Sequence, residues 1–277
     1  MPTVEVSAGP IEYIDTGGDG RVLVLLHGLA MDGRLWDGVI GSLGDGWRYV
    51  MPTLPFGAHR VPMHADADLS LRGIGRIVGE LLERLELRDV TLCFNDWGGA
   101  QVMIADGQMD RVARLALIAC EAFENYPPGL PGRLAAFSAR MPGGIEVMRR
   151  ALLVRRLREL PITFGRMSKH GVPDSIMREW LAPLAQREIR RDLAKYAGDA
   201  RRGRRDMLAA TPSLSTFDRP VLVVWAPEDR MMRPALGARL AATFPNARLV
   251  EVSDSYTLVP IDQPELLAVA LREFAGD

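Results

Sequence analysis

The sequence predicts an α/β protein with a mainly parallel sheet and helices on both of its faces. Apolar runs typical of buried strands alternate with helix-period segments up to about residue 122, and again after residue 214. Between these parts, residues 123–213 are rich in arginine and proline and contain helix-period segments without a good strand candidate. We therefore expect a core formed by residues 1–122 and 214–277. A helical cap, residues 123–213, is inserted after the sixth strand.

Eight strands are expected. Residues 21–28 form a continuous apolar run that ends in glycine, which suits a strand buried on both faces of a parallel sheet. Gly9 and Pro10 are expected in the turn between the first two strands. The strands are expected at residues 3–6, 11–15, 21–28, 48–54, 90–94, 112–120, 220–225 and 248–252, and the core helices at 35–43, 69–87, 98–107, 234–243 and 264–274.

Composition argues against a nucleic-acid partner and a membrane partner. The formal net charge is −1, and no stretch approaches the ~20 apolar residues of a membrane span. The first residues do not combine basic residues with an apolar run, so we expect no signal peptide. Cys93 and Cys120 lie in strand-like runs, so we expect buried thiols in a reducing compartment and no metal site. We expect a cytoplasmic monomer or homodimer that binds a small molecule and requires no cofactor.

The segment from Phe94 to Gly99 reads Phe-Asn-Asp-Trp-Gly-Gly and joins an expected strand to an expected helix. A sharp strand-to-helix turn that exposes a reactive side chain needs small residues beside it, because strand and helix approach closely. Gly98 and Gly99 meet this need, and Asp96 occupies the place of the reactive residue. The alternative is that Asp96 only caps the helix that follows.

This turn resembles the nucleophile elbow of the haloalkane dehalogenases and epoxide hydrolases, members of the α/β-hydrolase superfamily. Their elbows carry the same Asp-Trp-Gly-Gly sequence as residues 96–99. The resemblance implies the α/β-hydrolase fold and a nucleophilic role for Asp96, which attacks an alkyl carbon and forms an ester that water later hydrolyses.

The resemblance also assigns residues around the substrate. It implies that the backbone amides of Leu29 and Trp97 face the substrate, and that His27 holds its loop by packing. Position 30 is usually proline in these families and is Ala30 here. Leu29 has no side-chain donor for a halide, so a halide site would use Trp97 and a second donor. Trp180 of the cap could supply that donor, or could simply be an apolar cap residue.

Two carboxylates could serve as the triad acid. Asp229 follows the seventh strand, where many members of the superfamily keep this acid. Glu121 follows the sixth strand, where some dehalogenases have theirs. We favour Asp229, although either group could be a solvated carboxylate at a strand end.

The histidine expected as the triad base is missing. Aligned with the family motif on Asp262, Gln263 and Pro264, its position falls on Thr257, and no histidine follows His170. Threonine cannot accept a proton near neutral pH, so ester hydrolysis would need another base.

Three hypotheses follow from this loss. His59 or His170 could replace the base; Asp96 could itself act as acid or base in a non-hydrolytic reaction; or the cavity could bind a ligand without chemistry. Tyr126, Tyr196 and Tyr256 are candidate donors to a substrate oxygen. Arginines at 149–150, 155–156 and within 201–205 make the cap basic, which predicts a solvated surface or attraction of an anionic partner.

Overall fold

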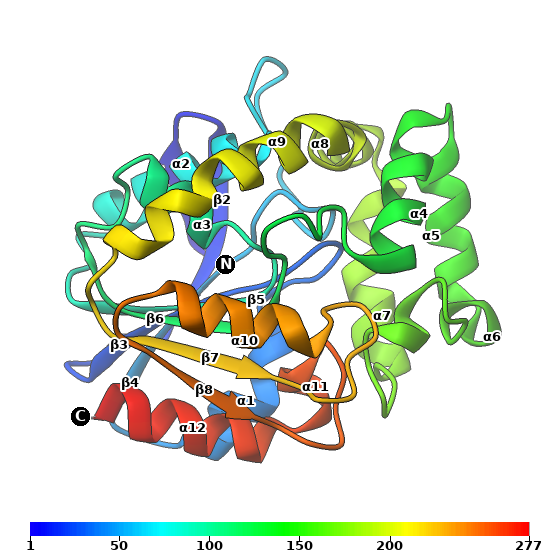
Figure 1. Cartoon of the computed structure of the whole chain (residues 1–277). Coiled ribbons are helices and arrows are strands. Elements are labelled where there is room, and N and C mark those ends of the chain that lie inside the picture. Colours follow the sequence, from blue (N-terminus) through cyan, green and yellow to red (C-terminus); the bar gives the residue numbers. More distant parts are fainter. Residues whose placement is uncertain (277) are drawn as a thin grey trace.

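An eight-stranded sheet forms the centre of the computed structural model, which describes residues 1–276 (Figure 1). The strand order is β1-β2-β4-β3-β5-β6-β7-β8; β1 pairs with β2 and β2 with β4 antiparallel, and the remaining pairs are parallel. The strands are β1 (Thr3–Val6), β2 (Gly9–Asp15), β3 (Arg21–Leu26), β4 (Trp47–Pro52), β5 (Val90–Asp96), β6 (Val112–Cys120), β7 (Val221–Trp225) and β8 (Ala247–Glu251). The predicted fold class is confirmed. The placement of Gly9 and Pro10 in a turn is wrong, because both pair with β1 as the first residues of β2.

Helices cover both faces of this sheet. α1 and α12 pack on each other along one face, and α2, α3 and α10 lie on the other (Figure 1). The bounds are α1 (Asp37–Leu43), α2 (Leu71–Arg84), α3 (Ala100–Ala105), α10 (Pro234–Thr243), α11 (Val259–Asp262) and α12 (Pro264–Gly276). Each follows a strand, so the carboxyl ends of the parallel strands share one edge of the sheet, where ligands bind in this architecture.

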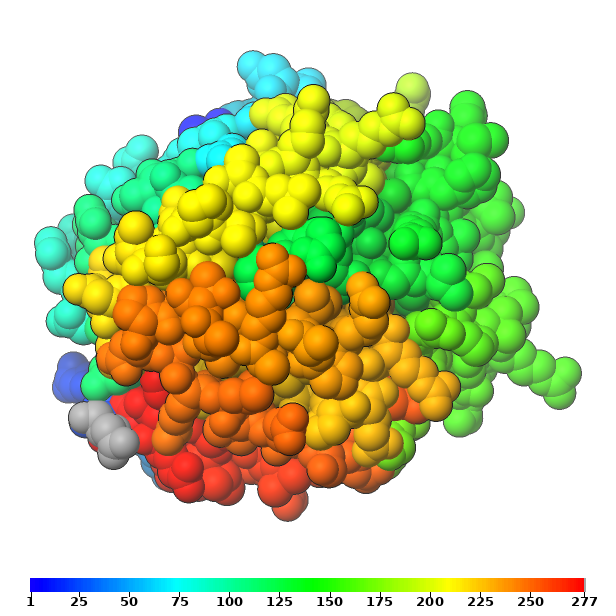
Figure 2. Space-filling model, viewed as in Figure 1, coloured from blue at the N-terminus to red at the C-terminus, as the bar shows by residue number. Residues whose placement is uncertain are grey.

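Among the described residues, every regular element between β6 and β7 is a helix. It contains α4 (Gly129–Arg140), α5 (Gly144–Leu153), α6 (Arg155–Arg158), α7 (Asp174–Leu181), α8 (Arg187–Gly198) and α9 (Ala200–Ala210). α4 packs against α5 and α8, and the green residues of this part form one end of the molecule in Figures 1 and 2. We call this segment the cap.

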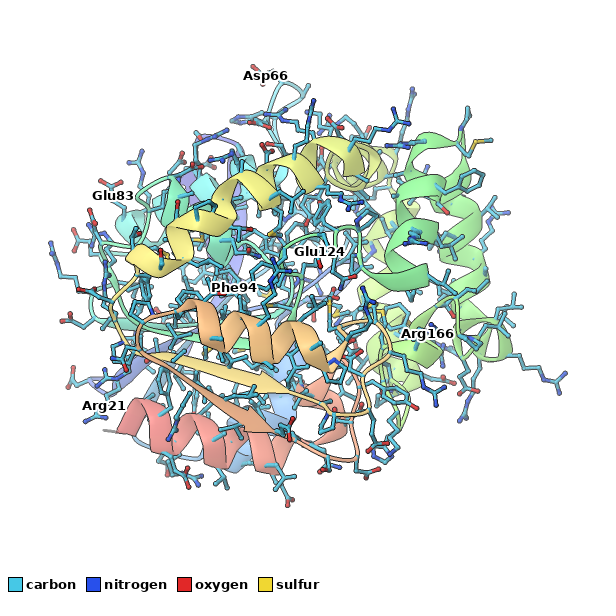
Figure 3. All side chains as sticks on the ribbon, viewed as in Figure 1. Arg21, Asp66, Glu83, Phe94, Glu124 and Arg166 are labelled. Carbon is cyan, nitrogen blue, oxygen red and sulfur yellow. The ribbon has the colours of Figure 1, made fainter. Side chains whose placement is uncertain are left out.

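The strand that carries the elbow, β5, is buried along its whole length. Every residue from Val90 to Asp96 is buried, and Phe94 points into the interior (Figure 3). β5 lies between β3 and β6, so both of its edges are hydrogen-bonded. Asp96 is therefore fixed by the sheet itself. Among residues 1–276 no helix is both long and apolar enough to cross a bilayer.

Candidate active site

The elbow has the strained geometry that its sequence predicts. Asp96 ends β5 with φ 64°, a left-handed conformation that costs about 1 kcal/mol or more for a residue other than glycine. A Cβ atom on Gly98 would lie 2.3 Å from the Glu121 carbonyl oxygen. The residue that caps α3 is Gly99, and no side chain donates or accepts a capping bond there. Asp96 is thus not a helix cap, and its carboxylate is available to the space in front of the sheet.

Burial controls the charge of Asp96. The residue is 6% exposed, and desolvation raises the pKa of its carboxyl group to about 7. The opposing influence is the Leu29 backbone N–H, which donates to Asp96 Oδ2 at 3.3 Å. Asp96 therefore changes between acid and carboxylate near neutral pH.

Glu121 lies beside Asp96 at the end of β6. Its N–H donates to the Asp96 carbonyl oxygen at 3.0 Å, and its Oε2 accepts from the Gly98 N–H at 3.3 Å. Burial, and next the negative charge of Asp96, raise the pKa of Glu121 well above its ordinary value. Two such carboxyl groups do not both ionise easily, because the negative charge of one raises the pKa of the other.

Asp229 is hydrogen-bonded to Thr257. The Thr257 hydroxyl donates to Asp229 Oδ2 at 2.9 Å, and the backbone N–H groups of Met231 and Met232 donate to Oδ1 at 2.7 and 2.8 Å. Burial nevertheless raises the pKa of Asp229 to about 7, because desolvation outweighs these bonds. The Asn95 side-chain amide donates to the Thr257 carbonyl oxygen at 2.8 Å and ties this loop to the elbow.

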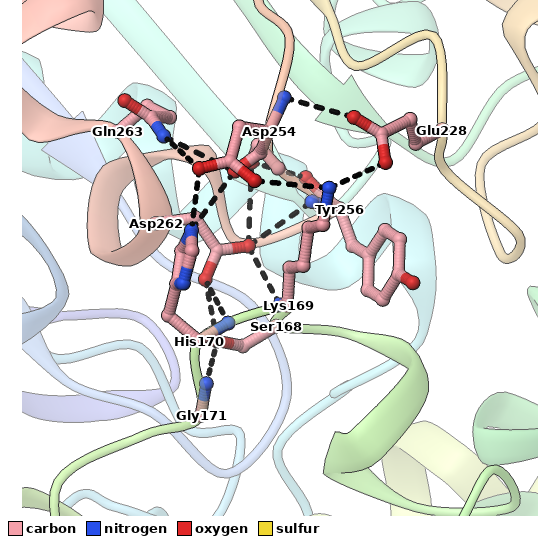
Figure 4. Close-up of polar contacts among 10 residues, drawn as sticks. Ser168, Lys169, His170, Gly171, Glu228, Asp254, Tyr256, Asp262 and Gln263 are labelled. Atoms are coloured by element: carbon pink, nitrogen blue, oxygen red, sulfur yellow. Dashed lines mark hydrogen bonds and ion pairs between the residues drawn. The ribbon is translucent and has the colours of Figure 1, made fainter.

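The carboxylate of Asp262 holds the loop that carries Thr257 (Figure 4). It accepts from the Ser168 hydroxyl at 2.6 Å and from the backbone N–H groups of Lys169, His170 and Tyr256 at 2.9, 3.1 and 3.0 Å. The cap and the loop after β8 are thus joined through one buried side chain. Thr257 is therefore held firmly in a fixed loop.

The histidines predicted as replacement bases do not reach this site. His59 is buried, its Nε2 lies 3.3 Å from Asp192 Oδ2, and its Nδ1 accepts from the Gly57 N–H. His170 is half exposed and bonded to Asp254 (Figure 4). Neither lines the cavity in front of Asp96, so the structure does not bring His59 or His170 to this site. The pattern missed the pairing with Asp192 because that residue lies 133 positions away.

His27 has the packing role that its sequence suggests. Its Nε2 accepts from the Leu54 N–H at 2.9 Å, and its Nδ1 lies 2.8 Å from the Gly28 carbonyl oxygen. Burial lowers the pKa of His27 to about 4, so the ring is neutral. It holds the loop that presents Leu29 to Asp96.

The two tryptophans differ from the expectation. Trp97 lines the cavity, and its buried indole Nε1 has no hydrogen-bond partner among the described residues. Its backbone N–H, expected to face the substrate, donates instead to the Asn95 carbonyl oxygen at 2.7 Å. Trp180 was a candidate halide donor, but its indole donates to Asp32 Oδ1 at 2.9 Å and is not part of the cavity lining.

The backbone geometry at Ala30 does not suit the proline that the resemblance implies at this position. Its φ is 57°, and its N–H donates to the Phe56 carbonyl oxygen at 2.9 Å. Proline has φ near −65° and no N–H, so it fits neither feature.

A mainly apolar cavity opens between the sheet edge and the cap. Its empty space is about 860 Å³, part of it open to solvent, which suits a small organic molecule. Asp96 and Glu121 line it from the core, and Tyr126 and Tyr196 from the cap. Burial raises the pKa of both phenols, so they are neutral donors. No motif marks these tyrosines in the sequence. No histidine lines the cavity in the part of the chain that the structure describes.

Comparison with known proteins agrees with this geometry. The Alpha/beta hydrolase family model matches residues 23–270, so the chain belongs to that family. The chain is 29% identical to haloalkane dehalogenase 2 of Mycobacterium tuberculosis over 285 residues, with 98% of this chain and 93% of that protein covered. It is 28% identical to a cis-3-alkyl-4-alkyloxetan-2-one decarboxylase of Xanthomonas campestris, with 95% and 91% covered.

A solved structure shares the fold. An ancestral haloalkane dehalogenase is similar at a TM-score of 0.76 and 20% identity, with 100% of this chain and 98% of that chain covered. The dehalogenases and esterases among its homologues support hydrolase activity in general.

Substitution of Gly28 tests the tight contact at the elbow. A Cβ on Gly28 would lie 2.1 Å from Asp96 Oδ2, so Gly28→Ala must displace the carboxylate or its loop. We expect a loss of about 1–3 kcal/mol in unfolding free energy, measured by chemical denaturation. Gly41→Ala, at a site where nothing lies within 4 Å of the added atom, is the control. Equal unfolding free energies for Gly28→Ala and Gly41→Ala would contradict the predicted clash between the added Cβ and Asp96.

The buried carboxyl groups predict a pH dependence of stability. In the folded protein Asp96 has a pKa of about 7, against 3.8 for an ordinary aspartate, so the native state binds more protons between these values. The stability that Asp96 contributes increases as the pH falls from 8 toward 4. It is lost as the pH rises through 7. We therefore expect Asp96→Asn to be more stable than wild type at pH 8, by about 1–4 kcal/mol, with a smaller difference at pH 5.

Chemical denaturation at pH 5 and pH 8 measures this difference. Asp218→Asn, which removes an exposed carboxylate, is the control. The same pH dependence in Asp96→Asn and wild type would show that Asp96 does not titrate with the raised pKa.

Proposed function

We propose that the protein is a hydrolase that opens a small apolar epoxide with Asp96 as nucleophile, and that Glu121 carries the proton. The observation behind this proposal is the pair of adjacent carboxyl groups, Asp96 and Glu121, that faces one cavity without an imidazole. The proposed charges of the pair match the first step, which needs one carboxylate and one acid.

In the first step the Asp96 carboxylate attacks a ring carbon. A C–O bond to Asp96 forms, the ring C–O bond breaks, and the ring oxygen takes the proton of Glu121. Tyr126 and Tyr196 are neutral phenols in the same cavity and can donate hydrogen bonds to that oxygen. The products are an alkyl ester on Asp96, a free hydroxyl group and the Glu121 carboxylate.

In the second step Glu121 works as the base. Once Asp96 is an ester its negative charge is gone, and with it one cause of the raised pKa of Glu121. Glu121 takes a proton from water, and the oxygen of that water adds to the ester carbonyl. The ester C–O bond breaks, the released alkoxide takes the proton of the new Asp96 acid, and a diol leaves. Both carboxyl groups return to their starting states.

The backbone amide of Leu29 supports this second step. It already donates to Asp96 Oδ2, the atom that gains negative charge when water adds to the ester. One buried donor of this kind contributes roughly 10²–10³ in rate.

An oxygen leaving group suits the site better than a halide. A halide departs without a proton, which would leave Glu121 protonated and the ester without a base. The relatives named as haloalkane dehalogenases therefore support the family and hydrolase activity in general more than a halide substrate.

A second candidate is a non-hydrolytic enzyme that uses Asp96 as acid or base. The raised pKa of Asp96, about 7, favours it, because proton transfer is efficient when the pKa lies near the working pH. A protein that binds its ligand unchanged remains the third hypothesis.

Terminal epoxides of increasing chain length test the proposal. We expect wild type to form diols. Glu121→Gln should lose about 10²–10⁴ in turnover and accumulate a stable adduct seen by intact mass, because Tyr126 and Tyr196 can still supply the proton for ring opening while the base for ester hydrolysis is gone. Asp96→Asn should form no adduct. Glu124→Gln is the matched control, because Glu124 is an exposed carboxylate paired with Arg239. Turnover of Glu121→Gln at the wild-type rate would refute Glu121 as the base. Neither product nor adduct across the panel, which should include 1-haloalkanes and an oxetan-2-one, would count against Asp96 as nucleophile.

Position 257 can be tested in the same assay. Thr257→His places an imidazole beside Asp229, so in the Glu121→Gln background we expect it to release the trapped ester. Folding is checked by thermal unfolding, because a larger buried side chain costs about 1–3 kcal/mol. A folded double variant whose adduct persists as in Glu121→Gln would show that position 257 does not reach the ester.

A further inference from the structure

Two cap helices carry exposed apolar side chains close to the cavity. Leu134 of α4 and Met148 of α5 line the cavity. On the outer surface, Phe137 of α4 is 62% exposed and Val147 of α5 is 68% exposed. A helix on the surface of a globular protein normally presents a polar outer face. The outer faces of α4 and α5 depart from this rule.

The exposed apolar side chains continue past these helices to residue 162. Nine of the fifteen exposed large hydrophobic residues of the described chain lie between residues 130 and 162, so they are concentrated on this end of the molecule. Figure 2 shows this part, in green, as one end of the molecule. We call them the cap surface: Leu130, Phe137, Met141, Val147, Leu153, Val154, Leu157, Leu160 and Ile162.

Arginines alternate with these apolar residues. Along α4 the residues at 130, 133, 137 and 140 are spaced by three or four and share one face, which alternates Leu, Arg, Phe and Arg. Arg150 lies three residues after Val147 on α5. Residues 129–166 contain eight arginines, two glutamates and neither lysine nor aspartate, a net charge of 8 − 2 = +6 in a chain of net charge −1. Arg133 and Arg156 are exposed and form no ion pair with the described residues.

We propose that the cap surface binds an anionic lipid surface. Exposed apolar side chains beside arginines are the combination that holds a helix at a charged lipid interface. A second copy of this chain fits less well, because a symmetric dimer would place these arginines against each other. This binding requires no membrane-spanning helix, and it departs from the absence of a membrane partner expected from composition.

The position of the cavity gives the proposed lipid contact a role in substrate entry. Ile162 is 45% exposed and also lines the cavity, so the cavity approaches the surface within the cap surface. An apolar substrate dissolved in lipid would enter without crossing water. The lipid contact goes beyond the proposed function and does not depend on it.

Vesicle cosedimentation tests the proposal. The probes are vesicles of phosphatidylcholine alone and of an equal mixture of phosphatidylcholine and phosphatidylglycerol. We expect binding to the mixture to exceed binding to phosphatidylcholine at least roughly tenfold and to weaken with added salt. Arg133→Glu with Arg156→Glu should weaken it more than roughly tenfold, at about fivefold for each arginine removed. Phe137→Ser with Val147→Ser should also weaken it, by roughly tenfold.

The matched control is Arg84→Glu with Arg88→Glu, which makes the same change in charge away from the cap. Figure 3 labels Glu83, next to Arg84, on the opposite side of the molecule from Arg166 of the cap. This control should bind the vesicles like wild type. Thermal unfolding confirms that each variant folds, and either cap pair suffices if the other does not fold.

Three results would overturn the proposal. The first is no binding to the mixed vesicles, and the second is binding that neither cap pair weakens. The third is a concentration-dependent dimer, or binding to an acidic protein, that depends on the cap pairs while the vesicles remain unbound.

Discussion

The desolvation of one carboxylate, Asp96, governs the site. The sheet fixes it between β3 and β6, and the left-handed turn directs its side chain to the sheet edge. Its side chain is buried, and one amide, that of Leu29, is its hydrogen-bond donor among the described residues. A charge held this way is costly, and its pKa rises until the group titrates near neutral pH. The crowding by Gly28 and the coupling to Glu121 both follow from the same confinement.

The two other carboxyl groups near Asp96 differ in how fully they are bonded. Asp229 receives two backbone N–H groups and the Thr257 hydroxyl, so its geometry is fixed by the protein. Glu121 receives one N–H at 3.3 Å and lines the cavity. A carboxyl group that carries protons needs unoccupied lone pairs facing the substrate. This difference supports Glu121 for proton transfer and a positioning role for Asp229.

Much of the core could be predicted from sequence because its signals are local. Continuous apolar runs marked β3, β5 and β7, and small residues after Asp96 marked the elbow. Contacts that join distant segments could not be predicted in this way. His59 is paired with Asp192 and Trp180 with Asp32, and these bonds occupy the groups that their residue types suggested for the site. Tyr126, in the loop before α4, and Tyr196 of α8 line the same cavity, and no spacing in the sequence indicates that they do.

The hydrogen-bond donors in the cavity also bear on the identity of the leaving group. A halide released at Asp96 would find the Trp97 indole, which has no partner among the described residues, but not Trp180, which is bonded to Asp32. The neutral donors that line the cavity are Trp97 and the phenols of Tyr126 and Tyr196, and a halide held by them would keep its full negative charge among apolar side chains and carboxyl groups. An alkoxide, by contrast, can be neutralised by a proton, and Glu121 and the two phenols all carry one there. The balance of donors in the cavity therefore supports the proposed preference for substrates whose broken bond ends on oxygen.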